Sequence, residues 1–274
     1  MANTRQIRRV TGTLQRVSAA RLPGDRQAIE NSSLYTDGLA FLVRNLRAVA
    51  PGADHPYLRE AGGGAALVVV FGSERGLCGG FNGSLVERFG ELTAGYGGRP
   101  VRVVAVGKIV NRRLRRMGAA VDLFVPQPSP AKRREFVDRI FDFLDDGYRK
   151  GLFGTADILQ NVSVSPFRQE TALTRLLPVA RESGTDPEFA RSAFEPAPQR
   201  ILAGILAEYA RQMLDNAFLK SIEAEDAARQ AAMSRATENA GKILEDLRRR
   251  YSRLRQENIT TEMIELAGGG AQRT

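Results

Sequence analysis

Cysteine, histidine and tryptophan are almost absent from this sequence. Its 274 residues include one Cys, one His and no Trp. One Cys cannot form an intrachain disulfide, and one Cys with one His cannot build a zinc cluster. A nucleophilic enzyme based on Cys78 would have only His55 as its imidazole base. The sequence therefore predicts neither a metal site nor a disulfide framework.

Long apolar segments are also lacking. The longest stretch without charge in the first two thirds of the chain, residues 61–73, has 13 residues and is rich in glycine. A membrane-spanning helix needs about 20 apolar residues, so no span is expected. The N-terminus has no apolar core of a secretory signal, although its arginines superficially match an organelle transit peptide.

Lysine contributes little to a strongly basic composition. Only 5 of the 40 basic residues are Lys, and the formal net charge is +9. Arginine binds phosphate or carboxylate groups in a bidentate manner, so a nucleic acid or an acidic protein is the first partner to consider. Basic runs occur at residues 112–116, 132–134 and 248–250, but no aromatic residues suited to base stacking lie among them. We therefore favour a solvated or protein-facing surface and expect no nucleic-acid partner.

The two ends of the chain are predicted to be helical. In the first 50 residues an apolar seam at the 3.5-residue coiled-coil spacing favours a retained helix over a transit peptide. That seam consists of Ile7, Val10, Leu14 and Val17. Pro23 and Gly24 are expected to kink or interrupt this helix.

The C-terminal third has no proline after Pro198, and its helical pattern runs from about residue 199 to 267. Alanines from Ala224 to Ala240 form a small-residue seam, which Leu244, Leu247, Tyr251 and Leu254 continue. A partner helix must cover such a seam.

Between the ends, strand and helix patterns alternate. Strands are expected at residues 65–71, 101–106 and 121–125, helices at 84–96, 108–117 and 131–148, and a hairpin at 157–165 and 170–179. The predicted fold class is therefore α/β: a long antiparallel coiled coil formed by the N- and C-terminal helices, with an inserted Rossmann-like α/β domain. The expected domains are a discontinuous shaft, residues 1–55 and 199–274, and a globular domain, residues 62–190.

A glycine-rich loop at residues 72–82 follows the first strand. It lacks the lysine of a P-loop and does not fit G-x-G-x-x-G, so no nucleotide cofactor is expected. Gly76-x-Cys78-x-Gly80 has the form of a nucleophile elbow. A Cys78 hydrolase is thus an alternative, but His55 precedes Cys78 instead of following it, and a buried thiol in a glycine turn is favoured.

Five segments carry a resemblance to a known family over essentially the whole chain. They are VSAAR (17–21), GSERGLCGGFN (72–82), FEPAP (194–198), EDAARQAAMSRATENA (225–240) and YSRLRQENITTEMIE (251–265). In this order they resemble the γ subunit of F-type ATP synthases.

The resemblance implies a rotor that is a non-catalytic subunit of an enzyme complex. Its coiled coil would stand inside a ring of α and β subunits, and its foot would sit on the c ring beside ε. Ion flow would turn the ring and drive ATP synthesis in β. The implied location is peripheral, on the cytoplasmic side of a bacterial plasma membrane. A rotor of a divergent, Na⁺-translocating complex is the alternative within the family.

The resemblance also assigns contact residues. Four positions of the last motif are implied to contact the α/β ring: Arg255, Gln256, Thr260 and Glu262. Leu14 takes the place of a family methionine near the same region, and Phe194 and Glu195 are implied to form the foot on the c ring. From charge alone, we further expect the arginines at 248–250 to face acidic loops of β.

Overall fold

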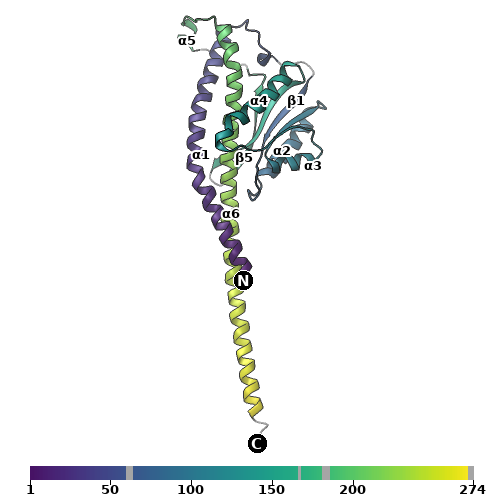
Figure 1. Ribbon diagram of the computed structural model, residues 1–274, viewed down its shortest axis with the longest axis vertical. Helices are drawn as coiled ribbons and strands as arrows, with labels where there is room; N and C mark the ends of the chain where they lie inside the picture. The colour runs from purple at the N-terminus through teal and green to yellow at the C-terminus, as the bar shows by residue number, and fades with distance from the viewer. Residues whose placement is uncertain (60–63, 166–167, 181–185, 271–274) are drawn as a thin grey trace.

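The computed structural model describes residues 1–59, 64–165, 168–180 and 186–270. Its helices are α1 (Ala2–Val49), α2 (Phe81–Gly95), α3 (Lys108–Arg116), α4 (Arg133–Arg149), α5 (Pro187–Arg191) and α6 (Pro198–Gly270), with short 3₁₀ turns at Pro56–Leu58 and Pro130–Lys132. Its strands are β1 (Ala65–Phe71), β2 (Val101–Val106), β3 (Val121–Val125), β4 (Phe153–Ser165) and β5 (Arg168–Leu177). Figure 1 shows a long two-helix rod with an α/β head on one side, which confirms the predicted fold class.

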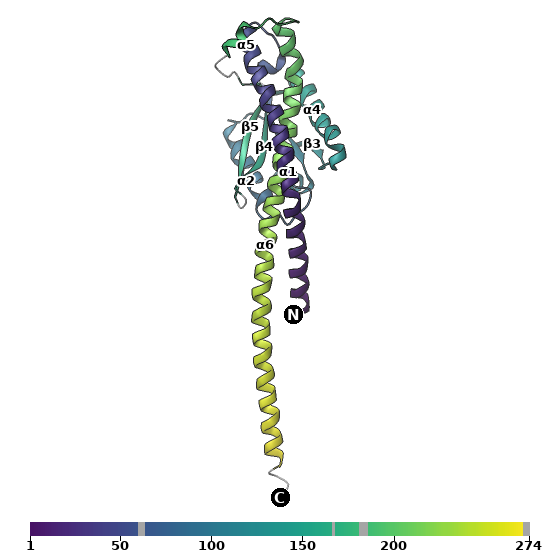
Figure 2. The same cartoon turned by 90° about the vertical axis from the view of Figure 1, so that its left-hand side faces the viewer.

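The rod consists of α1 and α6, which run antiparallel (Figures 1 and 2). With 73 residues, α6 is roughly 110 Å long at 1.5 Å per residue. The 48 residues of α1 cover only the part of α6 nearer its N-terminus. The rest of α6 extends alone past the N-terminus of the chain, because the two helices differ in length.

The expected interruption at Pro23 is wrong, because α1 continues through it without a break. Proline in a helix interior costs about 3 kcal/mol, since it removes one backbone hydrogen bond and crowds the preceding turn. Here Pro23 faces solvent, and the neighbouring Leu22 is buried against α6. Packing along the rest of α1 offsets the local cost, and the sequence pattern around Pro23 does not reveal this.

The predicted seam of α1 is also wrong, since Ile7, Val10 and Val17 are all about half exposed. A different stripe of α1 is buried, and it repeats at the same coiled-coil spacing: Ser18, Leu22, Ser32, Leu39, Val43 and Leu46. Two of its members are serines, which pair with polar groups of α6 and permit close approach. The apolar pattern misleads because the buried stripe combines four apolar side chains with two serines.

In the head, a single five-stranded sheet has the order β3-β2-β1-β4-β5. The pairs β1–β2, β1–β4 and β2–β3 are parallel, whereas β5 pairs antiparallel with β4. This is the open α/β arrangement expected from alternating strands and helices, with the predicted hairpin added at one edge. The hairpin strand β4 begins at Phe153, four residues before the expected start.

The two faces of the sheet have separate cores because side chains alternate along each strand. On one face Leu67, Val69 and Phe71 join α4 and the upper part of the rod. Phe136 of α4 and Phe218 of α6 meet there with ring centroids 4.5 Å apart. The opposite face packs against α2 and α3, so the head is anchored to the shaft mainly through its first face.

Candidate functional site

The head is joined to α6 by the loop that follows β1. Ser221 donates to the carbonyl of Phe71 at 3.1 Å, and Arg229 approaches the carbonyl of Gly76 at 3.5 Å. A Cβ on Gly79, which has φ +58°, would lie 3.7 Å from the Ala232 Cβ. Glycine in the loop and alanine on α6 thus bring the two backbones close together. The segment that looked like an enzyme loop in sequence is a contact between head and shaft.

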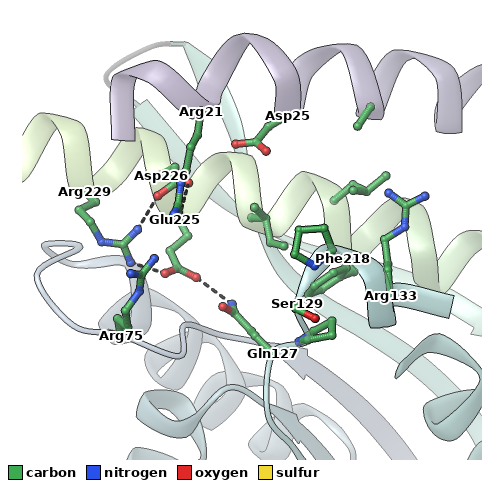
Figure 3. Close-up of a pocket in the computed structure, with 15 residues that line it drawn as sticks. Arg21, Asp25, Arg75, Gln127, Ser129, Arg133, Phe218, Glu225, Asp226 and Arg229 are labelled. Atoms are coloured by element: carbon green, nitrogen blue, oxygen red, sulfur yellow. Dashed lines mark hydrogen bonds and ion pairs between the residues drawn. The ribbon is translucent and has the colours of Figure 1, made fainter. Parts of the chain in front are cut away.

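A buried ion cluster lies at this contact. Arg229 donates to Asp226 at 2.5 Å and also to Glu225, one turn away on the same helix face. Gln127 of the head donates to Glu225 at 2.8 Å and to the carbonyl of Gly72 at 3.0 Å. Ser18 of α1 donates to Asp226 at 3.3 Å. The cluster therefore connects α1, α6 and the head at one level of the shaft, as Figure 3 shows.

Burial raises the pKa of the Glu225 carboxyl, and the charge of Arg229 and the Gln127 hydrogen bond offset part of that rise. For Arg229, burial lowers the pKa, but Glu225 and Asp226 outweigh it and the pKa is raised. The charged form of each group is thus stabilised by its partners, and loss of one partner would leave a buried charge without a counter-charge.

Asp25 lies beside this cluster, on a cavity of about 480 Å³ between α1, α6 and the head (Figure 3). Its Oδ2 atom is buried and has no hydrogen-bond partner within the described part of the chain. Burial raises the pKa of Asp25 to about 6, Asp226 and Glu223 raise it as well, and Arg21 opposes them. At neutral pH, Asp25 is an unfavourable charge within the shaft.

Replacing Asp25 with Asn is expected to stabilise the chain at pH 7.5 but not at pH 4. Because the pKa of Asp25 is higher in the folded than in the unfolded state, the free energy of unfolding of the native chain falls as pH rises from about 4 to 6. Discounted for the half-exposed side chain, the gain is about 1 kcal/mol. Urea unfolding at the two pH values measures it. Asp37→Asn, on the exposed side of α1, is the control, and equal gains in both variants would contradict the interpretation.

The second candidate surface is the free end of α6. Leu244 is buried against α1. Beyond it, four large apolar side chains are about half exposed or more: Tyr251, Leu254, Ile259 and Met263. An isolated helix that exposes large apolar side chains is a contact surface for another molecule. Arginines accompany these apolar residues at 248–250, 253 and 255, so this surface is also basic.

Comparison with known proteins decides the family. The ATP synthase family model that matches this chain covers residues 1–272. The chain belongs to the ATP synthase gamma-chain family. It is 33% identical to the ATP synthase gamma chain of Paracoccus denitrificans (98% of this chain, 95% of that one) and 30% identical to that of Maricaulis maris (98% and 95%).

Solved structures agree in fold. A chain of the Tetrahymena thermophila mitochondrial ATP synthase central stalk and c ring aligns with a TM-score of 0.63 at 17% identity, covering 83% of this chain and 99% of that one. A chain of the Euglena gracilis mitochondrial ATP synthase rotor aligns with a TM-score of 0.56 at 16% identity, covering 90% and 99%. The function predicted from the motifs, a rotor subunit of the central stalk of an F-type ATP synthase, is confirmed.

The residues that the gamma-chain resemblance assigned lie at three places along the shaft. Arg255, Gln256, Thr260 and Glu262 are exposed on the free end of α6. Leu14 lies on α1 and is half-buried. One turn before it, Thr11 accepts a hydrogen bond from Thr237 of α6 at 2.8 Å. Arg255 lies 18 residues beyond Thr237, roughly 27 Å along the helix. The structure therefore does not bring Leu14 together with the C-terminal group.

The assigned foot residues lie at the opposite end of the rod, near α5 (Figure 1). Phe194 is half-buried and packs on Phe189 with ring centroids 5.2 Å apart, whereas Glu195 is exposed. The residues expected to contact the α/β ring and those expected at the foot are thus separated by most of the length of α6. No sequence signal pointed to Gln127 or to Ser18, since these residues reach the ion cluster only through tertiary folding.

Cys78 has the surroundings of a structural thiol. It is buried, lies 3.7 Å from the Ser73 hydroxyl and is contacted by the Asn82 amide at 3.3 Å. Burial raises its pKa, which disfavours the thiolate that a nucleophile needs. His55 instead accepts a hydrogen bond from the backbone N–H of Tyr57. The Tyr57 side chain belongs to the core on one face of the sheet, and Cys78 belongs to the core on the other face. The hydrolase alternative is not supported.

Groups of metal ligands and membrane-spanning helices are both absent from the described part of the chain. No group of three or more His, Cys, Asp or Glu side chains there is arranged to hold a metal ion. None of the helices described is both long and apolar enough to cross a bilayer.

Proposed function

We propose that the free end of α6 stands inside a ring of α and β subunits and transmits rotation to the catalytic β sites. One observation carries this proposal: the last turns of α6 expose large apolar side chains that nothing in the described chain covers. Arg255, Gln256, Thr260 and Glu262 are the proposed contacts, together with the arginines at 248–250. Because α6 is a single asymmetric helix there, it presents a different face to each of three equivalent β subunits.

The foot proposed for the c ring is the end of the rod that carries Phe194 and Glu195. It lies far from the ring-facing end, as a shaft between two partners requires (Figure 1). The relatives of known structure are described as parts of a central stalk with its c ring and of an F1 with its c ring, which supports both partners. The ε subunit is the third proposed partner, on the strength of the family motifs alone.

We divide the chain into the shaft, residues 1–55 and 199–274, and the head, residues 62–190. The shaft transmits torque, and the head braces the half of the shaft nearer the foot through the ion cluster of Glu225, Asp226 and Arg229. The complex would lie peripherally on the cytoplasmic side of a bacterial plasma membrane, as for a bacterial gamma chain, and would couple H⁺ or Na⁺ flow to ATP synthesis.

Co-expression with α and β subunits tests the proposal. A complex with one copy of this chain for every three β subunits, and with ATPase activity higher than that of α and β alone, is the expected result. Subunit ratios from native mass spectrometry and the rate of ATP hydrolysis are the measurements. Failure to co-purify with α and β would contradict the proposed role.

A further inference from the structure

The helix α3 has an unusual concentration of positive charge. Five of its nine residues are basic and none is acidic: Lys108, Arg112, Arg113, Arg115 and Arg116. Val110 and Leu114 are fully buried and fix the helix on the sheet. This anchoring directs the basic side chains outward as an ordered patch, unlike the arginines of a flexible tail.

Most of this charge is not neutralised by any residue that the structure describes. Lys108 pairs with Glu74 at 2.6 Å, and Arg115 donates to Asn111 at 3.1 Å. The side chains of Arg112, Arg113 and Arg116 make no hydrogen bond or ion pair with any described residue. Three neighbouring cations without a counter-charge attract a polyanion or an acidic protein.

The same three arginines border a groove of about 570 Å³ between α2 and α3. The rest of its lining is apolar and consists of Val86, Ile109 and Met117. Met117 is 44% exposed and lies over α2, where a Cβ on Gly90 would be 3.5 Å from its Cε. The groove thus combines cationic walls with a place for one apolar side chain.

The groove is accessible from outside the molecule. Figure 1 places α3 on the side of the head that faces away from α1 and α6. The main packing partners of α3 are α2, β2 and β3, all within the head. A molecule bound here would therefore contact the rotor from the side, away from both the free end of α6 and the foot.

We propose that the groove between α2 and α3 docks an acidic polypeptide segment, whose carboxylates pair with Arg112, Arg113 and Arg116 and whose apolar side chain rests on Met117. Guanidinium groups bind carboxylates in a bidentate manner, and the apolar lining adds a contact that phosphate alone does not use. A nucleic acid fits less well because the patch spans only two helical turns and no aromatic side chain lies on it for base stacking. A lipid surface fits less well because the apolar residues line a recess.

The proposal is tested with the full-length chain and a fluorescein-labelled peptide of repeated Glu-Glu-Leu units. Fluorescence anisotropy should report binding that weakens with added salt. Arg112→Glu with Arg116→Glu should weaken it at least about tenfold, because each reversal replaces a charge-assisted hydrogen bond with a repulsion between carboxylates. Arg112→Lys with Arg116→Lys should retain most of the binding, because the charge remains.

Two controls separate this site from general charge attraction. Arg5→Glu with Arg9→Glu makes the same charge change on exposed positions of α1 and should alter the affinity less than twofold. Met117→Gln should weaken binding of the Glu-Glu-Leu peptide but should not weaken binding of a Glu-Glu-Ser peptide. Circular dichroism confirms that each variant is folded.

Three results would overturn the proposal. The first is equal weakening by the α1 variant, which would mean that net charge alone drives binding. The second is tighter, α3-dependent binding of random duplex DNA, and the third is tighter, α3-dependent binding of phosphatidylglycerol vesicles. Either of these two would assign the groove to that other class of partner.

Discussion

Replacing Arg229 with Met is expected to lower the free energy of unfolding by about 3–5 kcal/mol. The substitution leaves Glu225 and Asp226 buried without their cation, while Met fills a similar volume. Arg229 lowers the pKa of Glu225 in the native chain, so without it that pKa would rise further, and the variant should regain stability as pH falls and this carboxyl becomes protonated. Urea unfolding of the full chain at pH 7.5 and pH 5 measures both effects.

Arg235→Met is the matched control on the same helix. Arg235 is exposed, and its one side-chain hydrogen bond among the described residues goes to the carbonyl of Ala231 at 3.3 Å, so its loss should change the free energy of unfolding by less than about 0.5 kcal/mol. Adding Glu225→Gln and Asp226→Asn to Arg229→Met should recover part of the loss, because the unpaired charges are removed. A single Arg229→Met variant as stable as the control would show that the cluster is not an energetic unit.

Ending the chain after Leu247 is expected to leave its stability nearly unchanged while removing most of the coupled ATP synthesis. The deleted residues of α6 that the structure describes are exposed through Met263, so the free energy of unfolding should change by less than about 0.5 kcal/mol. If the free end is the contact with the ring, losing its apolar anchors costs about 2 kcal/mol or more of binding, which is more than tenfold. ATP synthesis by the complex in proton-loaded vesicles is the measurement.

Two leucines of α6 provide the comparison for that truncation. Leu244→Asp introduces a charge where α1 covers the helix and should destabilise the chain, whereas Leu254→Asp should not, because Leu254 is exposed. In the complex, Leu254→Asp should reduce coupling. A truncated chain that supports normal ATP synthesis would exclude the free end of α6 as the site of torque transfer.

The pattern of the sequence predicts the elements of the head well. The three parallel strands begin and end at the expected residues, because each is a short β-branched run bounded by turn residues. The start of β4 is missed, since Phe153 and Gly154 lie too near the end of α4 to show strand periodicity of their own. The predicted course of the C-terminal helix differs from α6 by a few residues at each end.

The predicted interface of α1 fails in its detail because three of its apolar positions are exposed and two of the buried positions are polar. Ile7, Val10 and Val17 are exposed, and Ser18 and Ser32 are buried. Ser32 accepts hydrogen bonds from Gln212 at 2.9 Å and from Asn216 at 3.2 Å. Burial of a hydroxyl is favourable only where a partner is in place, and those partners lie about 180 residues away along the chain.

The sequence by itself determined three things: a long two-helix shaft, an inserted α/β domain and membership of the gamma-chain family. They follow from the unbroken helical pattern after Pro198, the motifs at both ends and the scarcity of Cys, His and long apolar runs. Local periodicity and turn chemistry suffice for these features because they depend on neighbouring residues. Only the tertiary structure decided which face of α1 is buried, that the helix passes Pro23 intact, and that Gln127 and Ser18 meet Glu225 and Asp226. These depend on groups that are distant in sequence, whose pairing free energy exists only after the chain has folded.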